Sequence, residues 1–311
     1  MSTKVILDVD TGTDDAVALM VAALSPDLDL IAATTVCGNC RADVCTENTL
    51  RVMDHLGLDV PVYQGMTEPM VRPDFERATP SVIHGDYLDI PPARSQPCGQ
   101  HAVQWLIDTY LASDGDITLV PVGPLTNVAM ALRQEPAIVQ EIPEMVIMGG
   151  AHHIGNRSAS AEFNIWADPE AARLVVNSGC PMRMVPLDVT HKALLSLADC
   201  QGLRTLGTPA ATAAATFIER RIEGYRKYQP MSQIDAAPVH DALAVCAIID
   251  PSVITTEFIA VDVETRGELT SGRTVCDFGE RSGKEPNVHF AVDVDVPRFK
   301  ELLFDILARR A

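Results

Sequence analysis

The stretch KVILDVDTGTDDAVALM, residues 4–20, joins a short β-branched run to a helical pattern and decides how the rest is interpreted. KVILDV predicts a buried strand, and DDAVALMVAAL has the apolar spacing of a helix. The same alternation continues along the first third of the chain, with strands predicted in LDLIAATTV (28–36) and VPVYQG (60–65) and a helix in ADVCTENTLRVMDHLG (42–57). Apolar strands separated by helices predict a parallel sheet that is covered on both faces.

The alternation resumes further along the chain, and residues 197–249 then follow a mostly helical pattern. The segment Glu68–Gln100 is rich in Pro, Arg and Asp, and we expect a surface excursion near the site there. We find no linker and no repeat, so we predict a single domain over 1–311, an open doubly wound Rossmann-like sheet with a helical section in its C-terminal third. The remaining predicted elements are strands in DITLVPVG (116–123), EMVIMGG (144–150), PMRMVPLDV (181–189), TEFIAVDVE (256–264) and NVHFAVDVDV (287–296), and helices in PLTNVAMALRQ (124–134), DPEAARLVVNSG (168–179) and PRFKELLFDILARR (297–310).

Charge and composition restrict the possible partners. The chain has 24 Lys and Arg against 42 Asp and Glu, a net charge of −18, which argues against nucleic acid or an anionic membrane as a partner. No apolar run is long enough to span a bilayer, and no signal core precedes Asp8, so we expect a cytoplasmic protein. The eight scattered cysteines predict reduced thiols. Cys37 and Cys40 form a C-x-x-C pair typical of redox or zinc sites, but no second pair exists, and we interpret them as incidental.

Four carboxylates stand within DVDTGTDD, at the point where the first strand ends. Asp14 and Asp15 suit the first turn of a helix, where carboxylates favour the macrodipole. Asp8 and Asp10 alternate along the strand, and adjoining carboxylates repel each other unless they are protonated or bridged by a cation. Ligands of open parallel sheets bind at the carboxyl ends of the strands. The cluster therefore predicts a site for a hard cation, Ca²⁺ or Mg²⁺, held by oxygen ligands alone.

Two other interpretations of the cluster were weighed. An EF-hand is excluded because Leu19 stands at the twelfth position, where a bidentate Glu is required. A phosphatase of the D-x-D-x-T/V type uses its first Asp as a nucleophile, and here Gly12 replaces the Thr or Val. From the spacing alone, phosphoryl transfer stays open, since D-x-D motifs recur on many α/β folds.

Three further stretches carry polar groups in unusual places. PVHD, residues 238–241, opens an apolar helix, and taken alone it is explained by Asp241 as the N-cap. In AEFNIWADPEAA, residues 161–172, a capping loop explains Asp168 but neither Glu162 nor Asn164. In VPVGPLTN, residues 120–127, Gly and Pro end a strand and expose carbonyls that a hard cation accepts as ligands.

Taken together, these pieces resemble the inosine-uridine-type nucleoside hydrolase family. The family signature D-x-D-x-G-x-D-D stands here from Asp8 to Asp15. Four more family motifs follow in the family's order, so the resemblance covers nearly the whole chain and makes phosphoryl transfer a minor alternative. They are TTVCGN (34–39), MGGA (148–151), a GN-x(5)-EFN loop (155–164) and PVHD (238–241).

The resemblance implies hydrolysis of ribonucleosides to ribose and free base with one Ca²⁺ per chain. It implies that Asp10, Asp15, Asp241 and the carbonyl of Val122 ligate the ion, while Asp8 supports the site. The positions that match the ribose-binding residues are Asp14, Asn156, Glu162, Asn164 and Asp241, with Asn39 and Met148 beside the sugar.

For the reaction itself, the resemblance assigns the proton of the attacking water to Asp10 and protonation of the leaving base to His240. His84 and Tyr228 match positions at the base, and Phe163 is expected to pack on the sugar side. The chain departs from the family at HGDYL, residues 84–88, and at Ser232, where an Arg is frequent. Retention of His240 favours the nonspecific or pyrimidine-leaning type over the purine-specific type.

Two expectations complete the interpretation. The family implies a homo-oligomer, a tetramer or a dimer, acting on a small nucleoside in salvage. A calcium-dependent nucleoside binder without activity would keep the same ligands but would not need His240 and Asp10 poised as acid and base, and both residues are present.

Overall fold

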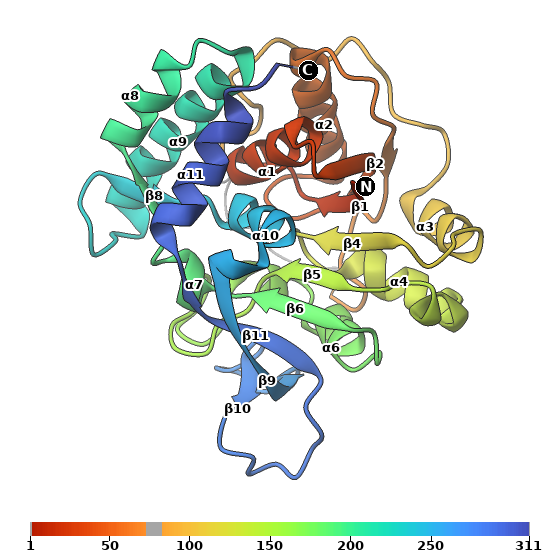
Figure 1. The fold of residues 1–311 in the computed structure, drawn as a ribbon. Helices are drawn as coiled ribbons and strands as arrows, with labels where there is room; N and C mark the ends of the chain where they lie inside the picture. The colour runs from red at the N-terminus through yellow and green to blue at the C-terminus, as the bar shows by residue number, and fades with distance from the viewer. Residues whose placement is uncertain (1, 73–82, 311) are drawn as a thin grey trace.

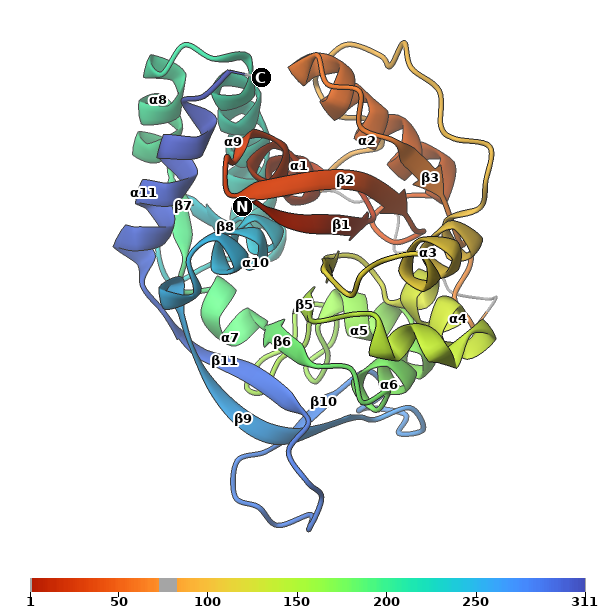
Figure 2. The same ribbon diagram turned by 45° about the vertical axis from the view of Figure 1, so that its right-hand side comes forward.

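The computed structural model describes residues 2–72 and 83–310, in which a nine-stranded sheet lies between two layers of helices (Figures 1 and 2). Its strands follow in the order β10-β9-β11-β6-β5-β4-β1-β2-β3. They are β1 (Thr3–Val9), β2 (Leu28–Thr35), β3 (Val62–Gln64), β4 (Ile117–Pro121), β5 (Met145–Met148), β6 (Met182–Val185), β9 (Ile254–Val263), β10 (Thr274–Asp277) and β11 (Val288–Val294).

Most of the sheet is parallel, as the sequence predicts. β1 pairs in parallel with β2 and β4, and parallel pairing continues through β5, β6 and β11. Only β9 runs against its neighbours β11 and β10. The order 3-2-1-4-5-6 is that of a doubly wound sheet, whose topological switch point lies between β1 and β4. The predicted fold class is thus confirmed.

Both faces of the sheet are covered because β1 alternates its apolar side chains between them. Val5, Leu7 and Val9 belong to one buried cluster, and Ile6 belongs to the other. The first cluster holds the inner faces of α1 (Thr13–Leu24), α2 (Ala42–Leu56), α8 (Leu197–Thr205), α9 (Pro209–Tyr228), α10 (His240–Ile249) and α11 (Val296–Leu307). The second holds those of α3 (Ala102–Leu111), α4 (Thr126–Gln134) and α6 (Pro169–Val176). Two short helices, α5 (Phe163–Ala167) and α7 (Leu187–Thr190), follow β5 and β6.

Residues 197–249 are mostly helical, as predicted, but a small sheet that the sequence pattern does not reveal lies beside their helices. β7 (Leu194–Ser196) pairs antiparallel with β8 (Ala236–Pro238). Each strand has only three residues, which is too short for an alternating pattern to stand out. Residues 73–82 of the predicted surface excursion lie outside the described residues. Ile83 and His84, which follow them, line the cavity of the candidate site.

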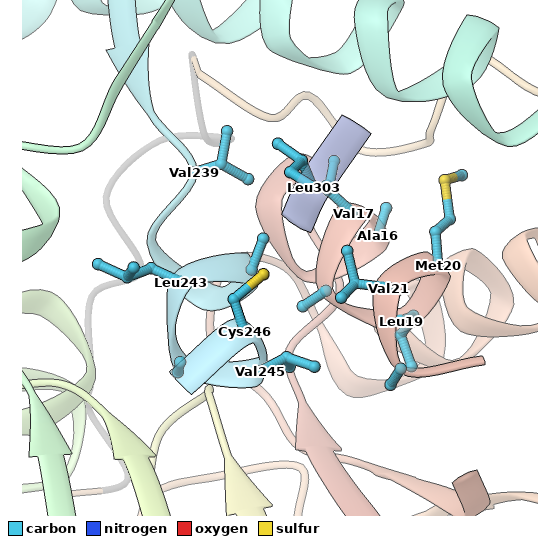
Figure 3. Packing of buried hydrophobic residues seen from close by; sticks show 14 of the residues in the cluster. Ala16, Val17, Leu19, Met20, Val21, Val239, Leu243, Val245, Cys246 and Leu303 are labelled. Atoms are coloured by element: carbon cyan, nitrogen blue, oxygen red, sulfur yellow. The ribbon is translucent and has the colours of Figure 1, made fainter. Parts of the chain in front are cut away.

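Two helices in the first cluster bring distant acidic residues together. α1 packs against α10, and both are apolar on nearly every side because both are buried. Figure 3 shows Val17 and Val21 of α1 close to Val245 and Cys246 of α10, with Leu303 of α11 above them. α1 begins beside Asp14 and α10 begins at His240, so this packing fixes the distance between the two helix starts.

The start of α10 differs from the sequence interpretation. Val239, not Asp241, is the N-cap of α10, so Asp241 points from the first turn rather than closing the helix end. None of the helices in the described residues is long and apolar enough to cross a membrane.

Candidate functional site

The candidate site lies at the topological switch point of the sheet. Asp10 directly follows β1, and Val122 directly follows β4. A cavity of about 250 Å³ opens there, at the carboxyl ends of the strands. Nearly all of the predicted site residues line it, namely Asp10, Asp14, Asn39, His84, Val122, Met148, Asn156, Glu162, Phe163, Asn164, Tyr228, His240 and Asp241.

Three carboxylates converge beside the cavity. Oxygens of Asp14, Asp15 and Asp241 lie within 4.8 Å of one another, and all three side chains are buried. Of the predicted ion ligands and substrate contacts, Asp15 alone does not line the cavity. Its carboxylate accepts the backbone N–H groups of Asp10 at 3.1 Å and Gly12 at 2.9 Å. It thereby ties the end of β1 to the start of α1.

Asp10 lies next to this group but outside it. One of its carboxylate oxygens accepts the backbone N–H of Asn39 at 2.6 Å, and the Asn39 side chain donates to Asp15 at 3.3 Å. Gly38 packs so closely on the Asp10 carboxylate that an added Cβ would overlap it. The loop after β2 therefore holds Asp10 in one orientation.

The electrostatics of the cluster favour a bound cation. Burial, and then the charge of Asp15, raise the pKa of Asp10 well above its usual range. Burial and Asp14 raise the pKa of Asp15 to about 6, and burial with the other carboxylates raises that of Asp241. A positive charge among these crowded carboxylates would stabilise their ionised forms. An oxygen-only donor set of this kind fits a hard divalent ion.

One buried cation already faces the cluster, and the sequence analysis did not identify it. Arg221 of α9 is 1% exposed, and its Nη1 lies 2.7 Å from Asp14. Its Nε donates to the carbonyl of Pro238 at 2.8 Å, two residues before His240. Arg221 thus connects the DVDTGTDD motif, through Asp14, to the PVHD motif, through Pro238.

The segment between β5 and α6, which includes α5, forms one side of the cavity. Glu162 is the N-cap of α5, and its carboxylate accepts the N–H groups of Gly150, Asn164 and Ile165. Burial raises the pKa of Glu162 to about 7. The Asn164 amide donates to the carbonyl of Val122 at 2.7 Å, so the predicted carbonyl ligand already accepts one hydrogen bond and keeps its second lone pair.

Two of the other predicted residues have structural partners. One oxygen of Asp8 accepts hydrogen bonds from Thr34 at 2.6 Å and Asn127 at 2.7 Å, which fits a supporting position behind Asp10. Asp168 caps α6, as the sequence predicts, through the N–H of Ala171.

Histidine and tyrosine side chains form another part of the cavity wall. His84 accepts the backbone N–H of Thr13 on Nδ1 at 2.9 Å, and burial lowers its pKa to about 4. Burial and Arg221 lower the pKa of His240 well below its usual range, so both rings are neutral. Tyr228 is 46% exposed and lies where the cavity opens.

Several lining residues were missed by the sequence analysis. Arg221, Tyr225 and Tyr228 stand at i, i+4 and i+7 of α9, so the predicted Tyr228 already marked the helix face that carries the other two. The missed lining residues are Gly38, Ile83, Arg157, Arg221, Tyr225 and Gln229.

The cysteines lie outside the acidic group. Cys37, Cys40 and Cys45 are buried near the loop that holds Asn39. Among the described residues, the acidic group is the only cluster with the spacing of metal ligands.

Comparison with known proteins connects this geometry to one family. The family model described as inosine-uridine preferring nucleoside hydrolase matches residues 5–301. The chain is 41% identical to the pyrimidine-specific ribonucleoside hydrolase RihB of Shigella flexneri, covering 95% of this chain and 94% of that one. It is 42% identical to the inosine-uridine preferring nucleoside hydrolase of Leishmania major, covering 99% and 98%.

Solved structures agree with these sequence matches. A purine-preferring ribonucleoside hydrolase from Gardnerella vaginalis superposes with a TM-score of 0.91 at 35% identity, covering 98% of each chain. A plant nucleoside hydrolase, the PpNRh1 enzyme, gives a TM-score of 0.93 at 31% identity, covering 99% of each chain.

Proposed function

Because the chain belongs to the inosine-uridine preferring nucleoside hydrolase family, we propose that it cleaves ribonucleosides to ribose and free base with a calcium ion in the carboxylate cluster. Membership makes the chain an enzyme that hydrolyses N-glycosyl compounds. The ion, the roles of the residues and the preferred base are our proposal. The observation that carries it is the group of three buried carboxylates within 4.8 Å of one another beside the cavity.

We assign the ion to Asp10, Asp15, Asp241 and the carbonyl of Val122. Asp14 lies in the same carboxylate group, but its 2.7 Å contact with Arg221 supports a different role, that of holding a ribose hydroxyl. An ion held by these residues would lower the pKa of a nearby water molecule and bind the vicinal hydroxyls of the sugar.

We assign different steps of the reaction to different residues of the chain. Asp10 takes the proton of the attacking water, because its carboxylate lines the cavity and is held in place by the backbone N–H of Asn39. Asn156, Glu162 and Asn164 bind the ribose, and their oxygens face the positive charge that develops at C1′ as the bond breaks. His240 is assigned to the protonation of the leaving base.

For the base, we propose the nonspecific or pyrimidine-leaning type. His84 and Tyr228 line the base end of the cavity, and Phe163 packs beside the sugar. The names of the relatives from Shigella flexneri and Leishmania major support this assignment. A cytoplasmic location and a homo-oligomeric state stay predictions.

Activity should depend on calcium. We expect ribose to be released from uridine and inosine in a reducing-sugar assay, to stop after dialysis against EGTA and to return with Ca²⁺. The ion should also raise the free energy of unfolding by about 2.7 kcal/mol at 100 times its Kd, because it binds only the folded cluster. Calcium binding without ribose release would instead indicate a nucleoside binder, and release of phosphate from nucleotides would indicate a phosphatase.

The loop after β2 offers a test of how tightly Asp10 must be held. Gly38→Ala should lower kcat by about 10²-fold, because the new Cβ displaces the Asp10 carboxylate. Gly99→Ala is the matched control, since no atom lies within 4 Å of its Cβ position. Steady-state kinetics with uridine compares the two, and equal activity would show that the orientation of Asp10 is unimportant.

A further inference from the structure

Arg157 is a basic side chain in the cavity wall to which the proposed mechanism gives no role. It directly follows Asn156 in the segment between β5 and α5, and it lines the cavity. Its Nε is buried and has no hydrogen-bond partner among the described residues. Within the same residues, no carboxylate forms an ion pair with its guanidinium, whereas Arg221, the other arginine of the cavity wall, is paired with Asp14. Because a buried N–H without an acceptor costs free energy, Arg157 is best satisfied by a ligand in the cavity.

Neighbouring groups hold the guanidinium of Arg157 in place. Its Cζ lies 3.9 Å from the centre of the Trp166 ring, a cation–π contact that fixes the plane of the group. Trp166 belongs to α5, and Gly272 packs so closely on it that an added Cβ would lie 2.7 Å from the Trp166 Cα. On the other side, the amide of Gln229 donates to the carbonyl of Asn156 at 3.0 Å. A ligand therefore has little ordering of this side chain to achieve.

We propose that Arg157 binds a phosphate on C5′ of the substrate, so that the enzyme also hydrolyses ribonucleoside 5′-monophosphates. This inference rests on the proposed function and extends its substrate class. A guanidinium suits a phosphate because its planar fork donates two parallel charge-assisted hydrogen bonds. The stacked, unpaired guanidinium of Arg157 has this fork available.

The place of the phosphate follows from the substituents of the ribose ring. In the proposed function, the ion binds the vicinal hydroxyls at C2′ and C3′, and the base lies at the end of the cavity lined by His84 and Tyr228. The group that remains is the one on C5′, and it is left for the segment 155–164. Because Arg157 follows Asn156 in that segment, its side chain meets a substituent on C5′.

The local charges allow an anion there although the chain as a whole is acidic, with a net charge of −18. Glu162 is the carboxylate of the same segment, and its oxygens accept the backbone N–H groups of Gly150, Asn164 and Ile165. These N–H dipoles partly offset its negative charge. Arg157 has no such partner, so its positive charge remains to attract an anionic substituent.

The reaction at C1′ is the same as for a nucleoside. The oxygen of water bonds to C1′, and a proton of that water goes to Asp10. The C1′–N bond breaks with its electron pair on the base nitrogen, which takes the proton assigned to His240. The products are ribose 5-phosphate and free base. The phosphate ester stays intact, so no inorganic phosphate is released.

Wild-type enzyme should release uracil from UMP with a kcat/KM within about tenfold of that for uridine, since the two substrates differ only at C5′. Chromatography measures uracil and ribose 5-phosphate, and a phosphate assay on the same samples measures inorganic phosphate. Enzyme that cleaves uridine but not UMP would overturn the proposal. Uracil that appears only with an equal amount of inorganic phosphate would also overturn it, because UMP would then have lost its phosphate first. Enzyme that cleaves neither substrate would contradict the proposed function itself.

Arg157→Met removes the charge but keeps an unbranched side chain beside Trp166. We expect the ratio of kcat/KM for UMP to kcat/KM for uridine to fall about 10- to 100-fold, the usual worth of a hydrogen bond to a charged group. Uridine, measured on the same sample, reports whether the variant folds. Arg157→Lys keeps the charge but loses the planar fork, so its ratio should lie between the other two. An unchanged ratio in Arg157→Met would refute the assignment.

Arg226→Met is the matched control. Arg226 lies near the C-terminal end of α9, but it is exposed, pairs with Asp235 and does not line the cavity. Its loss should leave the ratio within about twofold of wild type, because salt screens exposed charges. An equal fall in Arg226→Met and Arg157→Met would show that the ratio follows overall charge and not a contact of Arg157.

Inhibition of the wild-type enzyme tests the phosphate site without any variant. Ribose 5-phosphate should inhibit uridine hydrolysis at least about tenfold more strongly than ribose, because only the phosphate can accept hydrogen bonds from a charged donor as an anion. Equal inhibition by the two sugars would overturn the proposal even if the Arg157 variants did not fold.

Discussion

Asp10→Asn is expected to lower kcat for uridine and inosine by about 10²- to 10⁴-fold, the usual contribution of a general base. The amide has nearly the same shape, so it fills the space beside Gly38, but it cannot take a proton from water. Its neutral oxygen is also a weaker ligand for a divalent ion. Kinetics at saturating Ca²⁺, with calcium content measured on the same samples, separates the chemical effect from loss of the ion.

The matched control for this variant is Asp8→Asn. Asp8 stands two residues earlier in the chain and is equally buried, but its hydrogen bonds go to Thr34 and Asn127, and it does not line the cavity. An amide oxygen can accept both bonds, so activity should stay within about threefold of wild type. If Asp10→Asn with calcium bound were as active as Asp8→Asn, the assignment of the base would be wrong.

Arg221→Met should destabilise the protein by about 3–5 kcal/mol, the cost of removing one partner of a buried ion pair. The change leaves Asp14 without its cation among carboxylates and the carbonyl of Pro238 without its donor. The loss should be largest without calcium, because a bound divalent ion supplies part of the missing positive charge. Urea unfolding in EGTA and in saturating Ca²⁺ measures both values.

An exposed ion pair provides the control for this experiment. Arg204 on α8 lies 2.6 Å from Glu219, with both side chains more than a third exposed, and Arg204→Met should cost less than about 1 kcal/mol. A similar small cost for Arg221→Met would show that the cluster does not need this cation. A loss in Arg221→Met that is the same with and without calcium would show that the two positive charges act independently.

Much of the site was predictable because its polar groups break a strong local pattern. Asp10, Asp14 and Asp15 follow an apolar strand and open an apolar helix, so their position at the carboxyl edge of the sheet follows from the strand-helix alternation. The other residues at this edge were identified because PVHD and EFN resemble motifs of the family. The geometry that brings Asp241 to within 4.8 Å of Asp15 was implied by those motifs and is now explained by the packing of α1 on α10.

The rest was not predictable from local patterns. Arg221 and Tyr225 belong to a 20-residue helix that also carries an exposed arginine and an exposed tyrosine, and nothing in the spacing distinguishes a buried arginine from a solvated one. Their roles depend on contacts with Asp14, some 200 positions earlier, and with His240, after the next strand. Likewise, the hydrogen bond from Asn164 to Val122 joins the short helix α5 to the residue after β4, which is distant in the chain.

Periodicity and motif spacing are local properties of a chain, and they were enough to predict the class of the sheet, the acidic edge and most of the cavity residues. Three features follow from the folded arrangement alone: which carboxylate meets Arg221, that Asp241 is not a helix cap, and that both nitrogens of His240 have hydroxyl partners. These are contacts between elements far apart in sequence. They depend on how α7, α9 and α10 pack around the sheet, and side-chain packing of that kind leaves no periodic trace in the residues that make it.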